Sequence, residues 1–339
     1  MSTSRSTQTM PAWRQQRYGE ADTVTLESAP VPAPVRGQVL LRLRATGLNN
    51  GDTRVMRGEP LLVRLAFGVR RPRQPVRGMD AAATVVAVGE GVTGVAVGDE
   101  VVGELPGGGL ARYALAPAER LVRRPDSLDP VLAAALPVAG GTAWQALEKA
   151  GVAAAGTGDR PRVLVIGASG GVGTFAVQLA AQRGADVWAL CGERNRTLVE
   201  SLGAARTFDY RRVQPGAPEL GDGAFDAVLD IAGTAPLRVL RRLVRDGGRV
   251  VLVSGEGGRA LGPIGRLLRA ALLSFGAKRP LVPLTARPRP DVLAELMALA
   301  AGGELHPVIA RVAPFADAAD ALAEVAEGHV AGKVVVLAD

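Results

Sequence analysis

The chain has 339 residues, 47% of them hydrophobic, and a formal net charge of +7 at pH 7. This length favours two domains, each large enough to bury a core. The single cysteine, Cys191, excludes a disulfide framework and suits a reducing cytoplasm, and no apolar run is long enough to span a membrane. We predict a cytoplasmic protein whose polar residues 1–12 are disordered and are not a signal peptide.

The basic charge is concentrated in two segments, 54–77 and 259–289. The first has seven arginines and one glutamate, and the second has seven basic residues and no acid. Nucleic-acid binding usually adds aromatic side chains that stack on bases, and these segments contain only Phe67 and Phe275. We therefore expect no nucleic-acid partner. Residues 264–273 have the pattern of a basic amphipathic helix, which suits a lid or a subunit interface better than a membrane surface.

The N-terminal part of the chain has β patterns. Residues 38–45 alternate, so that Val39, Leu41, Leu43 and Ala45 share one face. Residues 83–102 contain valine-rich strands broken by glycine turns, as in the hairpins of a small barrel.

A glycine-rich turn between a strand and a helix follows in the middle of the chain. Strand 162–166 ends at the turn, and the helix after it ends at Gly184. Later segments alternate between strands at 186–190, 205–208, 226–231 and 248–253 and helices at 195–202 and 235–244. Because these strands are apolar without alternation, we predict a parallel sheet covered on both faces. A helix that starts at such a turn binds a dinucleotide pyrophosphate, although Ala168 replaces the first glycine of the fingerprint.

The end of the second of these strands indicates which dinucleotide is bound. An NAD site normally has an acidic residue here, whereas this chain has Gly192 followed by Arg194, Asn195 and Arg196. A small residue leaves room for a 2′-phosphate, and a guanidinium binds it by paired hydrogen bonds. We predict NADPH; Glu193 argues against it, and the alternative is a solvated helix start.

The C-terminal part has helical patterns at 291–301 and 314–328 and a last strand at 333–337. We expect this strand to return to the first domain. The prediction is a discontinuous catalytic domain, residues 1–130 with 290–339, around a nucleotide-binding domain, residues 131–289, with the active site in the cleft between them.

With these patterns, the chain resembles the medium-chain dehydrogenase/reductase superfamily, in particular its zinc-free quinone-oxidoreductase-like branch. The resemblance extends from residues 17–19 to residues 332–335, and the order and spacing of its motifs make it specific. The motifs include Gly47-Leu48-Asn49-Asn50-Gly51-Asp52, Gly78-Met79-Asp80, Val97-Gly98-Asp99-Glu100-Val101 and Leu136-Pro137-Val138-Ala139-Gly140-Gly141-Thr142-Ala143. It implies an α/β fold with a GroES-like β-barrel catalytic domain and a doubly wound Rossmann domain, and a homodimer.

The resemblance also bears on metal binding. Zinc-dependent relatives carry Cys-His where this chain has Asn49 and Asn50, and His-Glu where it has Met79 and Asp80. Catalytic zinc needs three protein ligands from Cys, His or carboxylate side chains. The only histidines of the chain, expected at the surface or in a hinge, are His306 and His329. We therefore predict no metal.

The resemblance assigns roles to individual residues. Asn49 would donate a hydrogen bond to the developing oxyanion, and Asp52 would orient it or join a proton relay, although Asn-Asn-Gly-Asp is also a β-turn pattern. The residues that would hold NADPH are Thr142, Ser169, Gly170, Gly171, Val172, Gly173, Gly192, Arg194, Asn195, Tyr210 and Lys333. Without the resemblance, Tyr210 is a strand-end aromatic and Lys333 a solvated strand residue. The residues that would line an apolar substrate pocket, or else belong to the core, are Met56, Phe67, Trp144 and Phe275.

Without a zinc Lewis acid, the chemistry favours acceptors that need little activation. We predict an NADPH-dependent oxidoreductase that transfers hydride to a small apolar quinone or α,β-unsaturated carbonyl, mainly by positioning it. One alternative is a dedicated enoyl reductase or redox-neutral cyclase of secondary metabolism. An alternative of another class is a non-catalytic protein that binds RNA or a membrane surface.

Overall fold

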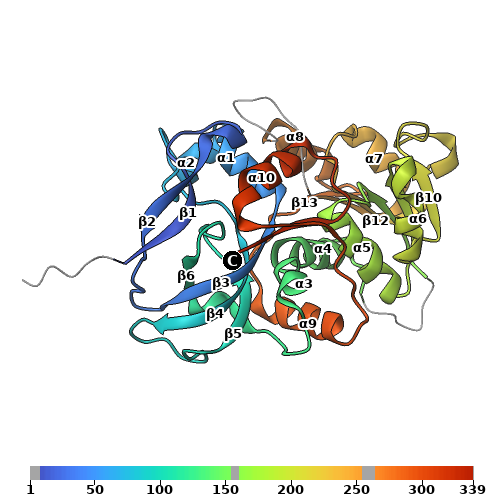
Figure 1. Cartoon of the computed structure of the whole chain (residues 1–339). Coiled ribbons are helices and arrows are strands. Elements are labelled where there is room, and N and C mark those ends of the chain that lie inside the picture. The colour runs from blue at the N-terminus through green and yellow to red at the C-terminus, as the bar shows by residue number, and fades with distance from the viewer. Residues whose placement is uncertain (1–7, 154–159, 254–263, 339) are drawn as a thin grey trace, which may run out of the picture.

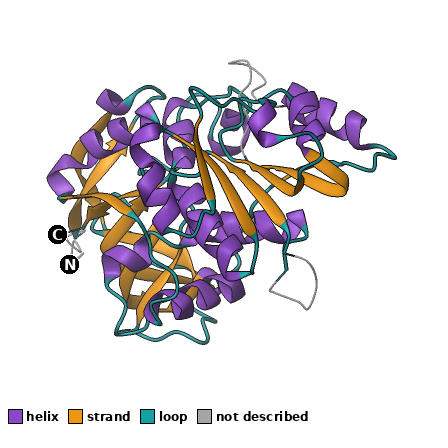
Figure 2. Cartoon of the chain, turned by 90° about the vertical axis from the view of Figure 1, so that its right-hand side faces the viewer, coloured by secondary structure: helices purple, strands orange, loops and turns teal. Residues whose placement is uncertain are grey.

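The computed structural model describes residues 8–153, 160–253 and 264–338. Two β-sheets with helices packed against them form the two halves of the molecule (Figures 1 and 2). In Figure 1 the N-terminal strands, in blue and cyan, lie on the left, and the strands of the parallel sheet lie on the right. The predicted α/β fold, with a β-rich half and a Rossmann half, is confirmed.

The left-hand sheet contains strands from both ends of the chain. Its order is β14-β15-β3-β4-β5-β7, with β6 paired to β3. The strands are β3 (Gln38–Leu48), β4 (Asp80–Val88), β5 (Glu100–Glu104), β6 (Tyr113–Pro117), β7 (Leu121–Arg123), β14 (Ile309–Ala313) and β15 (Lys333–Leu337). Strand β15 pairs antiparallel with β3 and parallel with β14. The last strand therefore does return to the first sheet, whereas the residue limits of the two domains stay a prediction.

A separate two-stranded sheet precedes this one and corrects an expectation. Strand β1 (Thr9–Gln15) pairs antiparallel with β2 (Val24–Pro30), so the prediction of disorder was wrong for residues 9–12. Ala12 is fully buried, and the Trp13 indole N–H donates to the Phe315 carbonyl at 2.8 Å. Contacts with distant segments thus order a stretch that directly follows a polar segment of the sequence. Residues 1–7 lie outside the described residues.

The right-hand sheet is parallel throughout, with the order β10-β9-β8-β11-β12-β13. Its strands are β8 (Arg162–Ile166), β9 (Asp186–Cys191), β10 (Arg206–Asp209), β11 (Phe225–Asp230), β12 (Val244–Leu252) and β13 (Leu281–Pro283). Between them lie α5 (Gly171–Gln182), α6 (Arg196–Ser201) and α7 (Leu237–Leu243). The predicted alternation is confirmed, although β12 begins earlier than predicted and β13 was not predicted.

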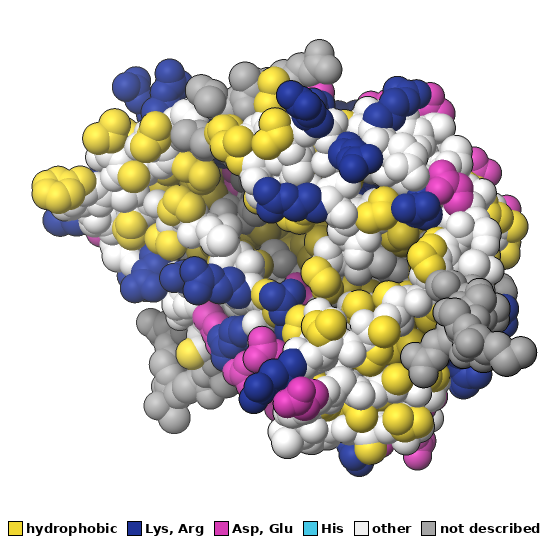
Figure 3. Space-filling view, turned by 90° about the vertical axis from the view of Figure 1, so that its left-hand side faces the viewer, with side chains coloured by type: hydrophobic (Ala, Val, Ile, Leu, Met, Phe, Trp, Pro, Cys, Tyr) yellow, Lys and Arg dark blue, Asp and Glu magenta, His cyan; other side chains and the backbone are white. Residues whose placement is uncertain are grey.

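The remaining helices belong to both halves and to the contact between them. They are α1 (Asn50–Arg57), α2 (Val63–Phe67), α3 (Pro130–Ala134), α4 (Pro137–Ala150), α8 (Ile264–Ser274), α9 (Pro290–Ala301) and α10 (Ala318–Glu327). Helix α4 packs against α5 of the Rossmann half and against α9. One hydrophobic cluster joins Ala45 and Ala82 of the first sheet to Val163 and Leu229 of the second. The face shown in Figure 3 is hollowed near its centre.

Candidate functional site

The loop between β8 and α5 has two positions that require glycine. Gly167 has φ +87°, a left-handed conformation that favours glycine. A Cβ atom on Gly173 would lie 2.2 Å from the Gly167 carbonyl oxygen and 2.7 Å from Ala168. Gly167, which we did not single out in the sequence, makes the tight turn expected of the missing first glycine. Gly173 allows close packing of the helix on the strand.

The same loop meets the last strand of the chain. Gly170 forms a parallel bridge with Gly332, whose N–H donates to the Ser169 carbonyl at 2.9 Å. A Cβ atom on Gly171 would lie 3.1 Å from Cδ of Lys333. The first N–H groups of helix α5, starting with Gly171 and Val172, have no partner inside the helix, so this end can accept an anion. The structure thus brings the predicted pyrophosphate residues and Lys333 together.

A second group of predicted cofactor residues lies at the ends of β9 and β10. A Cβ atom on Gly192 would lie 3.6 Å from Cε1 of Tyr210 and 3.8 Å from a terminal nitrogen of Arg211. The Arg211 guanidinium lies 4.9 Å from the centre of the Tyr210 ring. Gly192 and Tyr210 therefore lie together, and Arg211 is a basic residue beside them that the sequence analysis missed. Its position directly after Tyr210 was the available signal.

The arginines that follow Gly192 differ in their contacts. The exposed Arg194 donates to the His329 carbonyl at 2.8 Å. Arg196 is engaged with Thr207 and with Glu193. Asn195 donates its backbone N–H to the Gly192 carbonyl at 2.8 Å, which fixes the start of this turn. Arg194 and Arg211 therefore have more freedom to meet a phosphate than Arg196.

A buried polar cluster lies beside the glycine-rich loop. The Lys333 ammonium donates to the Asn49 Oδ1 at 2.5 Å, the Leu48 carbonyl at 2.9 Å and the Asp80 Oδ2 at 3.2 Å. Lys333 is 3% exposed and Asp80 is fully buried. All three ammonium protons thus have an acceptor, and Lys333 is not a solvated strand residue. Asp80 also accepts the Val138 N–H at the start of α4, at 3.0 Å.

Asn49 and Asp52 form the start of helix α1, not a β-turn. Asn49 precedes the first residue of the helix, and its backbone N–H donates to the Asp52 carboxylate at 3.0 Å. The Asn49 side-chain amide donates to Asp80 at 2.8 Å and to the Gly47 carbonyl at 3.4 Å. The second of these bonds is long and weak. Asn49 is therefore held between Lys333 and Asp80 and has one weakly engaged N–H.

The Asp52 carboxylate is 2% exposed and accepts two backbone N–H groups. These come from Asn49 and from Gly78, the latter at 2.9 Å. Burial, followed by the nearby charge of Asp80, raises the pKa of Asp52 to about 6. Its geometry makes Asp52 the residue that ties the Asn49 and Gly78 loops together.

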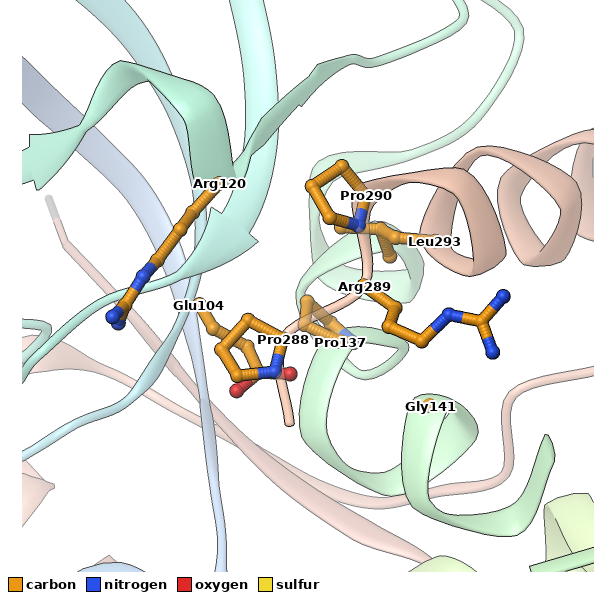
Figure 4. A pocket seen from close by; sticks show the side chains of 8 residues that line it. All are labelled: Glu104, Arg120, Pro137, Gly141, Pro288, Arg289, Pro290 and Leu293. Atoms are coloured by element: carbon orange, nitrogen blue, oxygen red, sulfur yellow. The ribbon is translucent and has the colours of Figure 1, made fainter. Parts of the chain in front are cut away.

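Glu104 lies opposite Asp80 across strands β4 and β5 and faces a small pocket (Figure 4). The pocket is lined by Glu104, Arg120, Pro137, Gly141, Pro288, Arg289, Pro290 and Leu293. Burial and the Asp80 charge raise the pKa of Glu104 to about 7. No local sequence pattern marks Glu104, because its burial depends on contacts with helices α4 and α9.

The other predicted site residues lie in different surroundings. Thr142 is half-buried on α4, next to Gly141. Met56 is fully buried in the core beneath β1, and Trp144 packs on the core of the Rossmann half and donates to Glu148. Phe67 is 39% exposed and Phe275 is 94% exposed. The roles proposed for these residues stay predictions.

Within residues 8–153, 160–253 and 264–338, no group of three or more His, Cys, Asp or Glu side chains is arranged to hold a metal ion. Both histidines, His306 and His329, are exposed. No helix in the same ranges is long and apolar enough to cross a membrane.

Known proteins resemble this chain over most of its length. A family described as alcohol dehydrogenase GroES-like domain matches residues 35–126, and one described as zinc-binding dehydrogenase matches residues 202–336. The chloroplast envelope quinone oxidoreductase homolog of Arabidopsis thaliana is 38% identical over 312 residues, which cover 91% of this chain and 92% of that protein. The 2-methylene-furan-3-one reductase of Solanum lycopersicum is 33% identical over 341 residues, with coverage of 96% and 79%.

Solved structures give the same result. The quinone oxidoreductase from Coxiella burnetii superposes with a TM-score of 0.83 at 26% identity and covers 97% of this chain and 99% of its own. The chain therefore belongs to the medium-chain dehydrogenase/reductase superfamily, in its quinone-oxidoreductase-like branch. The family resemblance predicted from the motifs is confirmed.

The substitution Gly173→Ala tests the close packing at the glycine-rich loop. The new methyl group would overlap the Gly167 carbonyl, so we expect a loss of about 1–3 kcal/mol in the free energy of unfolding, measured in urea. Gly265→Ala in helix α8 is the control, because no atom lies within 4 Å of its Cβ position. Equal stability of the two variants would contradict the proposed packing constraint.

Removal of the Lys333 ammonium tests the buried cluster. In Lys333→Met, Asp80 loses its cation, and we expect the free energy of unfolding to fall by about 3–5 kcal/mol at neutral pH. This decrease should be smaller at acidic pH, because protonated Asp80 carries no uncompensated charge. The exposed Lys278→Met is the control and should change stability by less than about 0.5 kcal/mol. Thermal unfolding across pH measures both.

The substitution Glu104→Gln tests the raised pKa of this group. Because the pKa of Glu104 in the folded protein lies above the ordinary value of 4.5, stability falls as the pH rises from about 4.5 to about 7. The variant cannot ionise, so we expect it to be more stable than the wild type by roughly 1–3 kcal/mol at alkaline pH and equally stable near pH 4–5. Urea unfolding at the two pH values is the measurement, and a difference that does not vary with pH would contradict the raised pKa.

Proposed function

We propose that this protein is an NADPH-dependent reductase that transfers hydride to a quinone or an α,β-unsaturated carbonyl without zinc. The observation that carries the proposal is the contact between the glycine-rich loop and the buried cluster of Asn49, Asp80 and Lys333. This contact puts a dinucleotide-binding loop next to a fixed cation and a carboxamide, and not next to a set of metal ligands.

The chain has residues suited to each part of the cofactor. Gly170 to Gly173 and the start of α5 would take the pyrophosphate, and the backbone needs the space that glycine leaves there. The adenosine 2′-phosphate end of the cofactor would be bound by Gly192, Arg194, Tyr210 and Arg211. Thr142 and Lys333 would lie toward the nicotinamide riboside. Bound NADPH supplies the hydride.

Asn49 is the residue we propose to contact the acceptor oxygen. Its weakly engaged N–H, 3.4 Å from the Gly47 carbonyl, is the donor we propose for an oxyanion, because the long bond to that carbonyl leaves it able to donate to a second acceptor without a rotation of the amide. Lys333 and Asp80 hold the rest of the amide in place, and the Lys333 charge favours negative charge nearby. Asp52 acts as a positioning residue, because both of its oxygens already accept backbone N–H groups.

The substrate class is supported by the residues that stand at the zinc-ligand positions of zinc-dependent relatives, and by the names of relatives. With Asn and Met where zinc-dependent relatives have ligands, an acceptor must already be activated toward hydride, as quinones and enones are. The names of two relatives, a quinone oxidoreductase homolog and a furanone reductase, are of these two classes. A cytoplasmic homodimer remains part of the proposal.

Oxidation of NADPH and NADH across a panel of quinones and enones tests the reaction. We expect faster turnover with NADPH than with NADH. In Arg211→Ala the KM for NADPH should rise roughly tenfold, whereas the KM for NADH should not change, because the guanidinium would contact only the 2′-phosphate. The neighbouring Arg212→Ala should behave like the wild type. Tight NADPH binding without turnover would favour a redox-neutral role, and equal use of NADH would contradict the 2′-phosphate site.

A further inference from the structure

A cluster of arginines surrounds Tyr18, which follows strand β1 and has no part in the proposed reductase site. The Arg64 guanidinium lies 4.5 Å from the centre of the Tyr18 ring. Burial raises the pKa of Tyr18, and the positive charges of Arg64, Arg77 and Arg73 oppose this rise, so all three act on the phenol. Helix α2 and the stretch between α2 and β4 thus bring three guanidinium groups to one aromatic ring.

The positive charge of this cluster is not compensated by acidic side chains. Within the described residues, none of the three arginines forms an ion pair with a carboxylate. Glu20, the acid closest to Tyr18 in sequence, is engaged with Arg57 at 2.9 Å. Asp52 acts on Arg77 through its charge, but both Asp52 oxygens already accept backbone N–H groups. The cluster therefore attracts negative charge from outside the chain.

Arg77 is the most deeply placed member of the cluster. It is 5% exposed, and its Nε atom is buried with no hydrogen-bond partner in the described ranges. The one hydrogen bond that its guanidinium donates in these ranges goes to the Gln74 carbonyl. A guanidinium has five N–H donors, and a buried charge is costly unless such donors have acceptors. In the part of the chain that the structure describes, Arg77 is thus a buried cation with unused donors.

The cluster extends from the interior to the surface. Arg77 is buried, Arg64 is half-buried and Arg73 is exposed. Arg64 is fixed by its Nε, which donates to the Gly58 carbonyl at 3.1 Å, and by its stacking on Tyr18. No described residue accepts a hydrogen bond from its two terminal nitrogens. The cluster therefore has an open side at Arg73, a closed side at Arg77 and free donors between them.

We propose that Arg64, Arg73 and Arg77 form a binding site for the terminal oxyanion of a small molecule, a carboxylate or a phosphate monoester. Planar guanidinium groups bind both anions by paired, charge-assisted hydrogen bonds. The depth of Arg77 favours a terminal group, because a phosphodiester inside a nucleic-acid chain is flanked by sugars on both sides. The bound anion supplies the negative charge that the three arginines lack.

This anion site adjoins the loops that hold Asn49. Arg77 directly precedes Gly78, whose N–H donates to Asp52 at 2.9 Å, and Asp52 also accepts the Asn49 N–H. Two sources of the anion fit this position, an acidic substituent of the hydride acceptor and a free anion. Only the first source rests on the proposed function, because binding of a free anion requires neither cofactor nor hydride transfer.

Calorimetric titration of the full chain with inorganic phosphate, at an ionic strength held constant with chloride, tests the site. The variant combines Arg64→Gln with Arg73→Gln, and its control combines Arg70→Gln with Arg71→Gln. Both lose two charges from one segment, but of these four arginines only Arg64 and Arg73 act on Tyr18. We expect phosphate affinity to fall about tenfold or more in the variant and to change less than about twofold in the control.

The matched control separates this site from other places where phosphate binds. Phosphate at the start of α5 is common to the variant and the control, so a difference between them reports the arginine cluster. Arg77→Met removes the innermost cation and should lower phosphate affinity at least as much. Circular dichroism shows whether this buried substitution leaves the protein folded, and the pair of more accessible positions decides the outcome if it does not.

Turnover of a naphthoquinone carboxylic acid and of its methyl ester with NADPH distinguishes the two sources. An anion carried by the acceptor predicts that the ratio of the KM for the acid to the KM for the ester rises about tenfold in the variant. A free anion predicts an unchanged ratio together with weakened phosphate binding. Absence of turnover in the wild type would contradict the reductase function alone, since the phosphate titration does not depend on it.

Three results of the phosphate titration would overturn the anion site. They are no binding to the wild type, equal binding to the variant and the control, and equal losses in both. The last result would show that phosphate responds to the overall positive charge of the segment and not to the three clustered guanidinium groups.

Discussion

The structure depends most on one buried cation. The Lys333 ammonium is removed from water and is stabilised by three oxygens, those of Leu48, Asn49 and Asp80. A buried charge is costly unless such partners are all in place. The cluster therefore fixes the relative positions of strands β3, β4 and β15 and of the start of α1. Helix α4 is fixed with them, because the Val138 N–H at its start donates to Asp80. The position of the Rossmann half relative to the first sheet follows from this cluster.

The glycine-rich loop is fixed from the same side. Ser169 and Gly170 pair with Gly332, which directly precedes Lys333. The glycine-rich loop and the polar cluster are therefore both held by the start of strand β15. A side chain at Gly171 would push against Lys333, and one at Gly173 would push the helix off the sheet. The glycines of this loop thus allow the close junction between the two halves, and in the proposed function they also leave space for the pyrophosphate.

Sequence patterns predicted the Rossmann half well, because strands buried on both faces are continuous apolar runs and a glycine turn marks the start of α5. The first half was predicted less completely. Strand β1 directly follows a polar segment and is ordered by contacts with residues from distant parts of the chain, such as Phe315. The motif at Asn49 has the composition of a turn, yet Asp52 caps a helix. The burial of Lys333 depends on Asp80, 253 residues earlier, and no local pattern carries that information.

The place of β15 in the first sheet has a consequence for biosynthesis. A ribosome releases β3 and β4 long before β15, and domains generally begin to fold as they emerge. The Rossmann strands are contiguous and can pair as soon as β13 is made, whereas β3 must wait for a neighbour supplied by the last residues of the chain. Until then Asp80 has no cation, so a chain cut short before Lys333 would carry an unpaired acid at the junction. The first sheet is thus begun first and completed last, which makes its assembly sensitive to premature termination.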